Sequence, residues 1–439
     1  MNNALQRLVE IQKEGRAVGI YSACSANPFV IEAAIRKGLS DDSCVLIEAT
    51  ANQCDQFGGY TGMKPADFRD FVYAIADENG FDRSRIFLGG DHLGPLTWTY
   101  LNEEKAMKNA VDLIRAYVAA GFTKIHLDTS MRVASDDPDL RLSDETIARR
   151  GALLCKTAEE TYAQLLKTDP NAVEPVYIIG SEVPIPGGSK GTVEEGLQIT
   201  KVDDLKASIK AFRKAFSDLG LRDAWKRVIA VVVQPGVEEK DSGCTEYDRT
   251  KAAELSAAIR KIPNLIFEGH STDYQTRYKL REMVEDGIGI LKVGPGLTFA
   301  AREALYALSF IEDEVCRVRH QTPSYFRIIL DDEMLKNDRN WKKYYLGSPT
   351  EVALKRKYSF SDRSRYYYAT PEVKKAINRL LDNLKDGAPL NLLSQFMPIQ
   401  YARVRDGSLK NDPKELILNR IGDAIDDYLY ATRQRELLR

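Results

Sequence analysis

The chain has 439 residues, enough for a large core, and its 62 Lys and Arg nearly balance its 64 Asp and Glu, for a formal net charge of -2 at pH 7. This balance excludes a global field that would draw in nucleic acid or an anionic membrane. No window approaches the roughly 18 continuous apolar residues of a membrane-spanning helix, and the N-terminal stretch has no signal-like apolar run. The six cysteines are scattered, as in a reduced protein. We therefore expect a cytoplasmic protein with no membrane partner and no nucleic-acid partner.

The first 320 residues alternate short apolar runs with amphipathic segments. A helix over about residues 5–15 is expected to close the bottom of the fold. The next helix has Asn27-Pro28 as its start signal and Gly38 as its stop signal. Strands are predicted over residues 17–22, 44–48, 86–88, 123–127, 176–179, 228–233, 264–267 and 289–293, each followed by a helix, over residues 29–37, 65–78, 103–120, 143–167, 202–219, 250–262, 274–285 and 298–315.

Eight strand-helix units make an α/β fold of the (β/α)8 TIM-barrel type the simplest architecture for residues 1–320. The alternative is a doubly wound open sheet. It is disfavoured because no strand is followed by a G-x-G-x-x-G turn; Gly294-Pro295-Gly296 comes nearest and lacks the third glycine.

Residues 321–439 change in character, with aromatic and basic clusters such as Arg363 to Tyr368 and helices expected over residues 371–384 and 415–430. We expect a helical C-terminal extension packed on the barrel. Aromatic side chains interleaved with arginine are also typical of a nucleic-acid surface. The near-neutral charge favours a packing or subunit contact instead, and we expect a homo-oligomer.

Polar residues follow the predicted strands at the end where parallel barrels carry their chemistry. The string Leu88 to Pro95, Leu-Gly-Gly-Asp-His-Leu-Gly-Pro, is the clearest case. Two imidazoles with one or two carboxylates suffice to bind a divalent cation such as zinc, manganese or nickel. A single histidine at a strand end is more often only hydrogen-bonded, but two such strings here favour a metal site. Its candidate ligands are His92, His270, Glu182 and Glu268.

Three carboxylates are candidates for catalysis. Asp91, Asp128 and Glu182 could move protons while a cation polarises the oxygen that gains charge. For Asp91 and Asp128 the alternative is that the carboxylate holds a ligating imidazole in its tautomer. Glu182 is either a ligand or a general base. His126 shares a strand face with Asp128 and is either a metal ligand or substrate contact, or a core residue.

Further residues are candidates for substrate binding. Asn52 and Gln53 lie in a loop rich in amides and glycine, a composition shared by sugar-binding loops and ordinary long turns. Gln234 ends the sixth strand with an amide. Lys292 could contact the substrate or form a Schiff base, and the many metal-type residues favour the first. Ser271 and Asp273 lie where barrels often bind a phosphate.

Several strings act together as a signature: residues 22–28, 47–53, 56–62, 89–95, 124–130, 180–184, 234–237, 267–273 and 358–363. Over nearly the whole chain they resemble the GatZ/KbaZ-type tagatose-bisphosphate aldolase subunit family, and more distantly the zinc-dependent class II aldolases. The second resemblance implies Asp91 as acid/base and His92 and His270 as ligands. Gln234 departs from it, because those enzymes have a further histidine ligand near that place.

The first resemblance implies two functions. Some members of the family resemble metal-dependent 4-epimerases that interconvert D-fructose and D-tagatose, and such an enzyme, acting on the ketohexose or its phosphate, is our leading hypothesis. Others are described as non-catalytic partners of a separate aldolase catalytic subunit, in galactitol or N-acetylgalactosamine catabolism. Older descriptions as tagatose-6-phosphate kinases are disfavoured, because no G-x-x-x-x-G-K-[ST] string is present.

Overall fold

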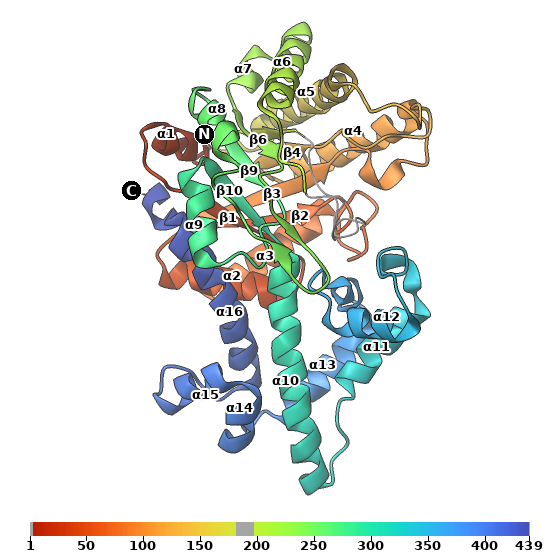
Figure 1. The fold of residues 1–439 in the computed structure, drawn as a ribbon, viewed down its shortest axis with the longest axis vertical. Coiled ribbons are helices and arrows are strands. Elements are labelled where there is room, and N and C mark those ends of the chain that lie inside the picture. Colours follow the sequence, from red (N-terminus) through yellow and green to blue (C-terminus); the bar gives the residue numbers. More distant parts are fainter. Residues whose placement is uncertain (1–2, 181–196, 439) are drawn as a thin grey trace.

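The computed structural model describes residues 3–180 and 197–438. Eight parallel strands close into a barrel in the order β1-β10-β9-β6-β5-β4-β3-β2 (Figure 1), which confirms the predicted (β/α)8 fold. The strands are β1 (Ile20–Cys24), β2 (Val45–Thr50), β3 (Ile86–Leu93), β4 (Lys124–Leu127), β5 (Val176–Ile179), β6 (Val228–Val233), β9 (Ile266–Gly269) and β10 (Ile288–Val293).

A helix follows each strand, as predicted. These are α2 (Pro28–Ser40), α3 (Pro65–Glu78), α4 (Glu103–Ala119), α5 (Asp144–Thr168), α6 (Val202–Asp218), α8 (Ala253–Arg260), α9 (Arg277–Glu285) and α10 (Pro295–Arg319), with a short α7 (Arg222–Trp225) before β6. The start signal of α2 is confirmed, because the Asn27 side chain accepts from the N–H of Phe29 at 2.9 Å. Helix α10 begins three residues earlier than predicted, directly at Pro295.

Strand β3 is longer than predicted. The sequence predicts its end at residue 88, whereas β3 runs to Leu93 and includes Asp91 and His92. Gly89 and Gly90 lie inside the strand and do not end it. Gly89 allows close packing there, because a Cβ at this position would come within 2.5 Å of the Glu48 side chain. The strand therefore carries its own polar residues into the barrel mouth.

The bottom of the barrel is closed by α1 (Gln6–Lys13). Its apolar face, with Leu8 and Ile11, joins a buried cluster that includes Leu46, Ile178 and Ile290 of the strands. Burial of this apolar surface stabilises the lower half of the barrel. The polar side chains of the strands lie in the upper half of the barrel, toward the carboxyl ends of the strands.

The C-terminal extension consists of α11 (Phe326–Lys336), α12 (Pro349–Tyr358), the turn η4 (Arg363–Tyr367), α13 (Pro371–Asn383), α14 (Leu390–Phe396), α15 (Pro398–Arg405) and α16 (Pro413–Thr432). It has more helices than the two predicted. Helix α16 runs beside α10 and packs on α2 and α9 (Figure 1). The chain then reaches the barrel strands again, where Gln434 donates to the carbonyl of Cys44 at 2.7 Å. The extension is therefore packed on the barrel.

A small hairpin of β7 (Glu238–Glu239) and β8 (Cys244–Thr245) lies in the loop after β6 and was not predicted.

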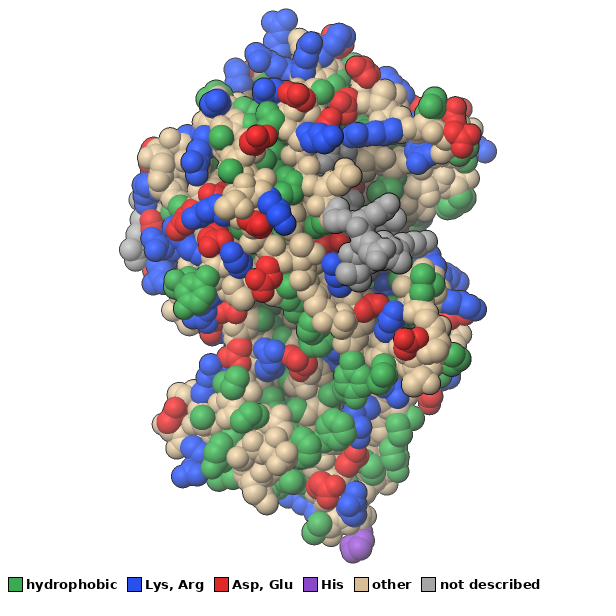
Figure 2. Space-filling model, viewed as in Figure 1, with side chains coloured by type: hydrophobic (Ala, Val, Ile, Leu, Met, Phe, Trp, Pro, Cys, Tyr) green, Lys and Arg blue, Asp and Glu red, His purple; other side chains and the backbone are tan. Residues whose placement is uncertain are grey.

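Acidic and basic side chains intermingle over the face of the molecule shown in Figure 2, as the balanced composition suggests. Among the described residues, no helix is long and apolar enough to cross a membrane.

Candidate active site

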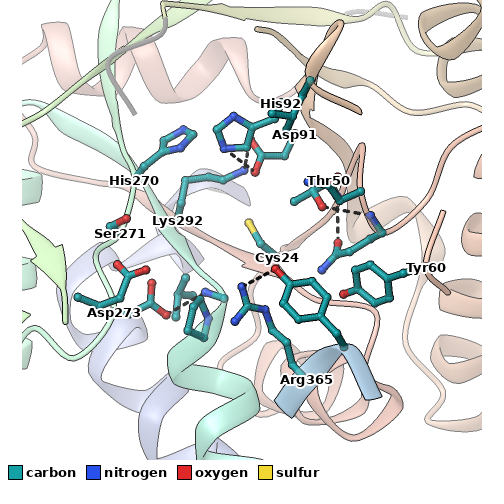
Figure 3. Close-up of a pocket in the computed structure, with 18 residues that line it drawn as sticks. Cys24, Thr50, Tyr60, Asp91, His92, His270, Ser271, Asp273, Lys292 and Arg365 are labelled. Carbon is teal, nitrogen blue, oxygen red and sulfur yellow. Dashed lines mark hydrogen bonds and ion pairs between the residues drawn. The ribbon is translucent and has the colours of Figure 1, made fainter. Parts of the chain in front are cut away.

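A cavity opens at the carboxyl ends of the barrel strands (Figure 3). The strands deliver Asp91, His92 and Lys292 to it directly, and His270 comes immediately after β9. The predicted site residues that line it are Asn52, Gln53, Asp91, His92, His270, Ser271, Asp273 and Lys292. The strand ends therefore bring together most of the residues that the sequence pattern singles out.

A layer of paired charges adjoins this cavity, and two of its members, Lys292 and Asp91, line the cavity themselves. The Lys124 ammonium lies 2.7 Å from Glu48 and 2.6 Å from Glu268, and all three side chains are fully buried. Lys292 lies 2.7 Å from the other oxygen of Glu48 and 2.9 Å from Asp91. Buried charges persist in proteins when they are paired in this way. The layer separates the apolar bottom of the barrel from the polar mouth.

His92 is held by a buried carboxylate. Its Nδ1 lies 2.7 Å from one oxygen of Asp128, whose other oxygen accepts from the hydroxyl of Ser130 at 2.6 Å. Burial alone would lower the pKa of His92, but the carboxylates of Asp91 and Asp128 outweigh it and raise the pKa above its usual value. When Nδ1–H donates to Asp128, the lone pair of the neutral ring is on Nε2.

His270 has a matching arrangement. Its Nε2 lies 2.9 Å from Glu268. Burial lowers the pKa of His270 to about 4, so the ring is neutral at physiological pH. When Nε2–H donates to Glu268, the lone pair is on Nδ1. Burial would raise the pKa of Glu268, but Lys124 and Lys292 hold it well below its usual range.

His126 differs from both, because protein groups face both of its ring nitrogens. Nδ1 accepts from the backbone N–H of His92 at 3.2 Å, and Nε2 lies 3.3 Å from the carbonyl oxygen of Gly180. Nδ1 is also 3.0 Å from Asp91. The ring is completely buried and is not among the described residues that line the cavity. These contacts favour a structural role over the predicted substrate contact.

Two groups of potential ligand atoms occur in the described part of the chain, each within 4.8 Å. One is formed by Asp91, His126, Glu268 and His270; the other is formed by Cys24, Glu48 and Asp91. The second group already has a cation, because the Lys292 ammonium contacts both of its carboxylates. The first includes two of the predicted ligands, Glu268 and His270, and leaves out His92.

The hydrogen bonds of the three histidines favour a different pair of ligands from the one that distance alone suggests. His92 and His270 each turn one nitrogen to a buried carboxylate, which leaves a lone pair on the other nitrogen when the ring is neutral, whereas protein groups face both nitrogens of His126. Two imidazoles that share one ion at about 2.1 Å with near-tetrahedral angles have ring centres roughly 5 Å apart. The rings of His92 and His270 are 5.1 Å apart. The separation of the His92 and His270 rings is thus compatible with one divalent ion shared between them, with Glu268 orienting His270.

The remaining predicted site residues lie elsewhere. Glu182 lies outside the described residues. The side-chain oxygen of Gln234 accepts from the N–H groups of Gly236 and Val237, at 2.8 and 3.0 Å, so it shapes its own turn. Asp128 is 1% exposed and reaches the cavity only through His92.

Lys292 is poorly suited to the Schiff-base alternative. Burial would lower its pKa, but Asp91, with Cys24 and Glu48, outweighs burial and raises the pKa well above its usual value. An amine that stays protonated is not a nucleophile. The ammonium instead keeps Asp91 ionised: burial would raise the pKa of Asp91, and His92 and Lys292 hold it well below its usual range.

Several cavity residues were not predicted. They include Cys24, Tyr60, Glu239, Arg365 and Tyr366. Arg365 comes from η4 of the extension and points toward the cavity (Figure 3). Arg365 belongs to the aromatic and basic cluster Arg363 to Tyr368, but nothing in the sequence indicates which of these side chains reaches the barrel mouth.

Comparisons with known proteins agree with this architecture. A family model described as "D-tagatose-1,6-bisphosphate aldolase subunit GatZ/KbaZ-like" matches residues 5–433. A crystal structure of a "probable tagatose 6 phosphate kinase" from Sinorhizobium meliloti is similar, with 44% sequence identity and a TM-score of 0.84. The match covers 94% of this chain and 100% of that chain.

More distant matches include aldolases. A fructose-bisphosphate aldolase from Campylobacter jejuni is 12% identical with a TM-score of 0.44, over 88% of this chain and 93% of that chain. The YdjI aldolase from Escherichia coli is 11% identical with a TM-score of 0.41, over 84% and 95%. Because the sequence identities and TM-scores of both matches are low, neither match supports a conclusion about the function of this chain.

Proposed function

Because this chain belongs to the D-tagatose-1,6-bisphosphate aldolase subunit GatZ/KbaZ-like family, we propose that it is a divalent-metal-dependent ketohexose 4-epimerase, interconverting D-fructose and D-tagatose or their phosphates. One observation carries the proposal: two imidazoles, each oriented by a buried carboxylate, line one open cavity. A protein that served only as a scaffold would have no physical need to bury these ionisable groups together, where they perturb one another's pKa.

His92 and His270 would hold the cation, with Glu182 as a further predicted ligand. Imidazole and carboxylate ligands suit zinc, manganese or nickel. When bound, the cation polarises the substrate oxygens that gain negative charge. Asp128 and Glu268 are positioning residues, since each contacts an imidazole and neither lines the cavity among the described residues.

Asp91 is the proposed acid/base. It lines the cavity, and the neighbouring Lys292 ammonium, 2.9 Å away, keeps it ionised, which is the form that can accept a proton, while the same charge lowers its basicity. Epimerisation returns that proton to the sugar, so one carboxylate serves both half-reactions. This holds for retro-aldol cleavage and re-addition, where the base takes the proton of the C4 hydroxyl and returns it to that oxygen. Inversion by deprotonation and reprotonation at C4 needs a second acid on the opposite face, for which Glu182 is the other predicted residue. Asn52, Gln53 and Ser271 supply polar groups for the sugar hydroxyls.

A second candidate is favoured by the wording of the family description, which names a subunit. In that case the chain would stabilise a separate aldolase catalytic subunit and turn over little sugar alone. The barrel and its cavity could then still bind sugar.

Incubation of the purified chain with D-fructose and manganese, nickel or zinc tests the first candidate. We expect D-tagatose to form and EDTA to abolish its formation, with chromatography as the measurement. Folded protein that gives no tagatose with any of the three metals would refute epimerisation of the free sugar. A rise in aldolase activity on adding the chain to a catalytic aldolase subunit would then support the second candidate.

A further inference from the structure

Arg365 is a positive charge in the cavity that the proposed mechanism does not use. Among the described residues, Lys292 and Arg365 are the Lys and Arg side chains that line the cavity. Lys292 is already paired, because its ammonium contacts both Glu48 and Asp91. Arg365 has no carboxylate within ion-pair distance in the described part of the chain. It is therefore the cation left for an anionic group of a ligand.

Part of the Arg365 guanidinium is used to fix its own position. Nη1 donates to the carbonyls of Ser361 and Asp362, the second at 2.9 Å, and Nη2 donates to the hydroxyl of Tyr366 at 3.0 Å. A guanidinium has five N–H groups. The Nε–H and one N–H of Nη2 have no partner among the residues that the structure describes. Figure 3 shows Arg365 pointing toward the cavity, across it from His92, so these donors are available to a ligand there.

Barrel loops hold the segment that carries this guanidinium. Tyr274, in the loop after β9, donates its hydroxyl to the carbonyl of Phe360 at 2.6 Å. The N–H of Phe360 donates to the carbonyl of Asp241, between β7 and β8, at 2.9 Å. Thr298 of α10 donates its hydroxyl to Asp362 at 2.5 Å. The extension is thus fixed to three parts of the barrel mouth, which pre-organises its cation for binding.

The backbone amides that often bind phosphate in α/β barrels are occupied here. The Oδ1 of Asp273 accepts from the N–H of Gly294 at 3.0 Å and from that of Gly296 at 2.7 Å. Arg365 acts electrostatically on Asp273, and both line the same cavity. A phosphate at this end therefore needs a side-chain donor, and Arg365 provides one.

The acidic side chains at this end do not exclude a phosphate. Two N–H groups offset the charge of Asp273. Burial, with Asp273 beside it, raises the pKa of Glu239 to about 7, so part of the molecules carry a proton there at neutral pH. A bound anion would raise that pKa further, because like charge favours the neutral form. A protonated carboxyl can donate to a phosphate oxygen.

We propose that Arg365 is a specificity-determining residue: the C-terminal extension supplies the guanidinium that binds the phosphate of a phosphorylated ketohexose, at the end of the cavity opposite the imidazoles. An arginine suits this role, because it stays charged and its donors match phosphate oxygens. That the sugar is a ketohexose rests on the proposed function; the binding of phosphate at Arg365 does not.

Isothermal titration of the full chain with D-fructose 6-phosphate and with D-fructose, in EDTA, tests the proposal. We expect the wild type to bind the phosphate ester at least roughly tenfold more tightly than the free sugar. Arg365→Gln should remove this preference by weakening binding of the ester, with free-sugar affinity changed by less than about twofold. Arg365→Lys keeps the charge without the fork of donors and should lose less. Arg339→Gln, at an exposed arginine of the extension, is the matched control for the lost charge and should bind both sugars as the wild type does.

A wild type that binds both sugars equally would overturn the proposal. So would a folded Arg365→Gln variant that keeps the preference, or one that loses affinity for both sugars by the same factor. If the Gln and Lys variants do not fold, a crystal structure of the wild type with D-fructose 6-phosphate decides: phosphate on the Arg365 guanidinium supports the proposal, and phosphate elsewhere overturns it. The titration involves no turnover, so a chain that binds the ester but epimerises no sugar would refute the proposed function and leave the phosphate result standing.

Discussion

His92 and His270 reach the same place with a constrained backbone. His92 itself has a left-handed φ of 51°, and Ser271, which follows His270, has a φ of 52°. For residues other than glycine this conformation costs on the order of 1–3 kcal/mol and persists only where the surroundings enforce it. Here the His92 N–H donates to His126 and its ring bonds Asp128. Both imidazoles are therefore pre-organised before any ligand binds.

Changing His270 to alanine should remove the metal and leave the fold intact. The ring lines a cavity, so its loss creates little new void in the apolar core. Loss of an outer partner of a ligand already costs roughly 10–100-fold in metal affinity, and loss of the ligand itself should cost at least as much. Metal content after dialysis is the measurement. His320→Ala is the matched control, because His320 is exposed at the end of α10 and should bind metal normally.

Asp128→Asn tests the positioning role at His92. The amide can still accept from Nδ1–H but has no charge to orient and polarise the ring. Metal affinity should fall roughly 10–100-fold, measured by competition with a chelator. In a His92→Ala background the same substitution should have no further effect, because the partner through which Asp128 acts is gone. An equal loss in both backgrounds would contradict the assignment.

The sequence could predict which residues meet at the mouth but not what each one contacts. Asp91, His92 and His270 follow from strand ends, because parallel strands of a barrel all end at one face. That Glu268 faces His270 and Lys124 depends on side-chain rotamers and on the register of neighbouring strands. Neither is encoded in local sequence, so the predicted ligand role of Glu268 differs from the orienting role that its contacts favour.

At the scale of elements, short segments between the regular strands and helices contribute to the cavity. The β7–β8 hairpin brings Glu239 and the η4 turn brings Arg365. Both segments are too short to have a hydrophobic period, which is the main signal for secondary structure in a sequence. The barrel was predictable because its strands and helices repeat such a signal; these two segments lack it.

The free energy of unfolding should depend on pH through Glu239 of the β7–β8 hairpin. Burial, with Asp273 beside it, raises the pKa of Glu239 from 4.5 to about 7. The folded chain therefore holds this proton more tightly than the unfolded chain, and stability falls as pH rises from about 4.5 to 7 and stays at its lower value above that. The loss is on the order of 3 kcal/mol at most.

Glu239→Gln should remove this loss. We expect the melting temperature of the variant to exceed that of the wild type at pH 8 and to match it near pH 4.5. Glu246→Gln, an exposed carboxylate in the same loop, is the control and should leave the profile unchanged. A wild-type profile that Glu239→Gln does not flatten would contradict the assigned titration.

At the scale of the whole molecule, the extension is built into the barrel. Helix α16 buries Ile421 and Ile425 completely, and it packs on α2, α9 and α10. Ion pairs join it to α2, including Arg36 with Glu415 at 2.8 Å. Such partly exposed pairs contribute little, so most of the stabilisation comes from apolar burial. Residues 1–320 and 321–439 are therefore two segments of the sequence, and we do not expect them to fold independently.

A fragment of residues 1–320 should consequently fail to fold cooperatively, because it exposes the apolar faces of α2 and α9 that α16 covers. A milder test in the full chain is Ile421→Ala. Removing a fully buried isoleucine side chain costs roughly 2–5 kcal/mol, whereas Ile399→Ala, at a residue of α15 that is 54% exposed, should change stability by less than about 0.5 kcal/mol. Chemical denaturation measures both. Cooperative unfolding of the fragment, or equal effects of the two substitutions, would mean that the barrel is stable without α16 and that the extension serves the cavity alone through Arg365.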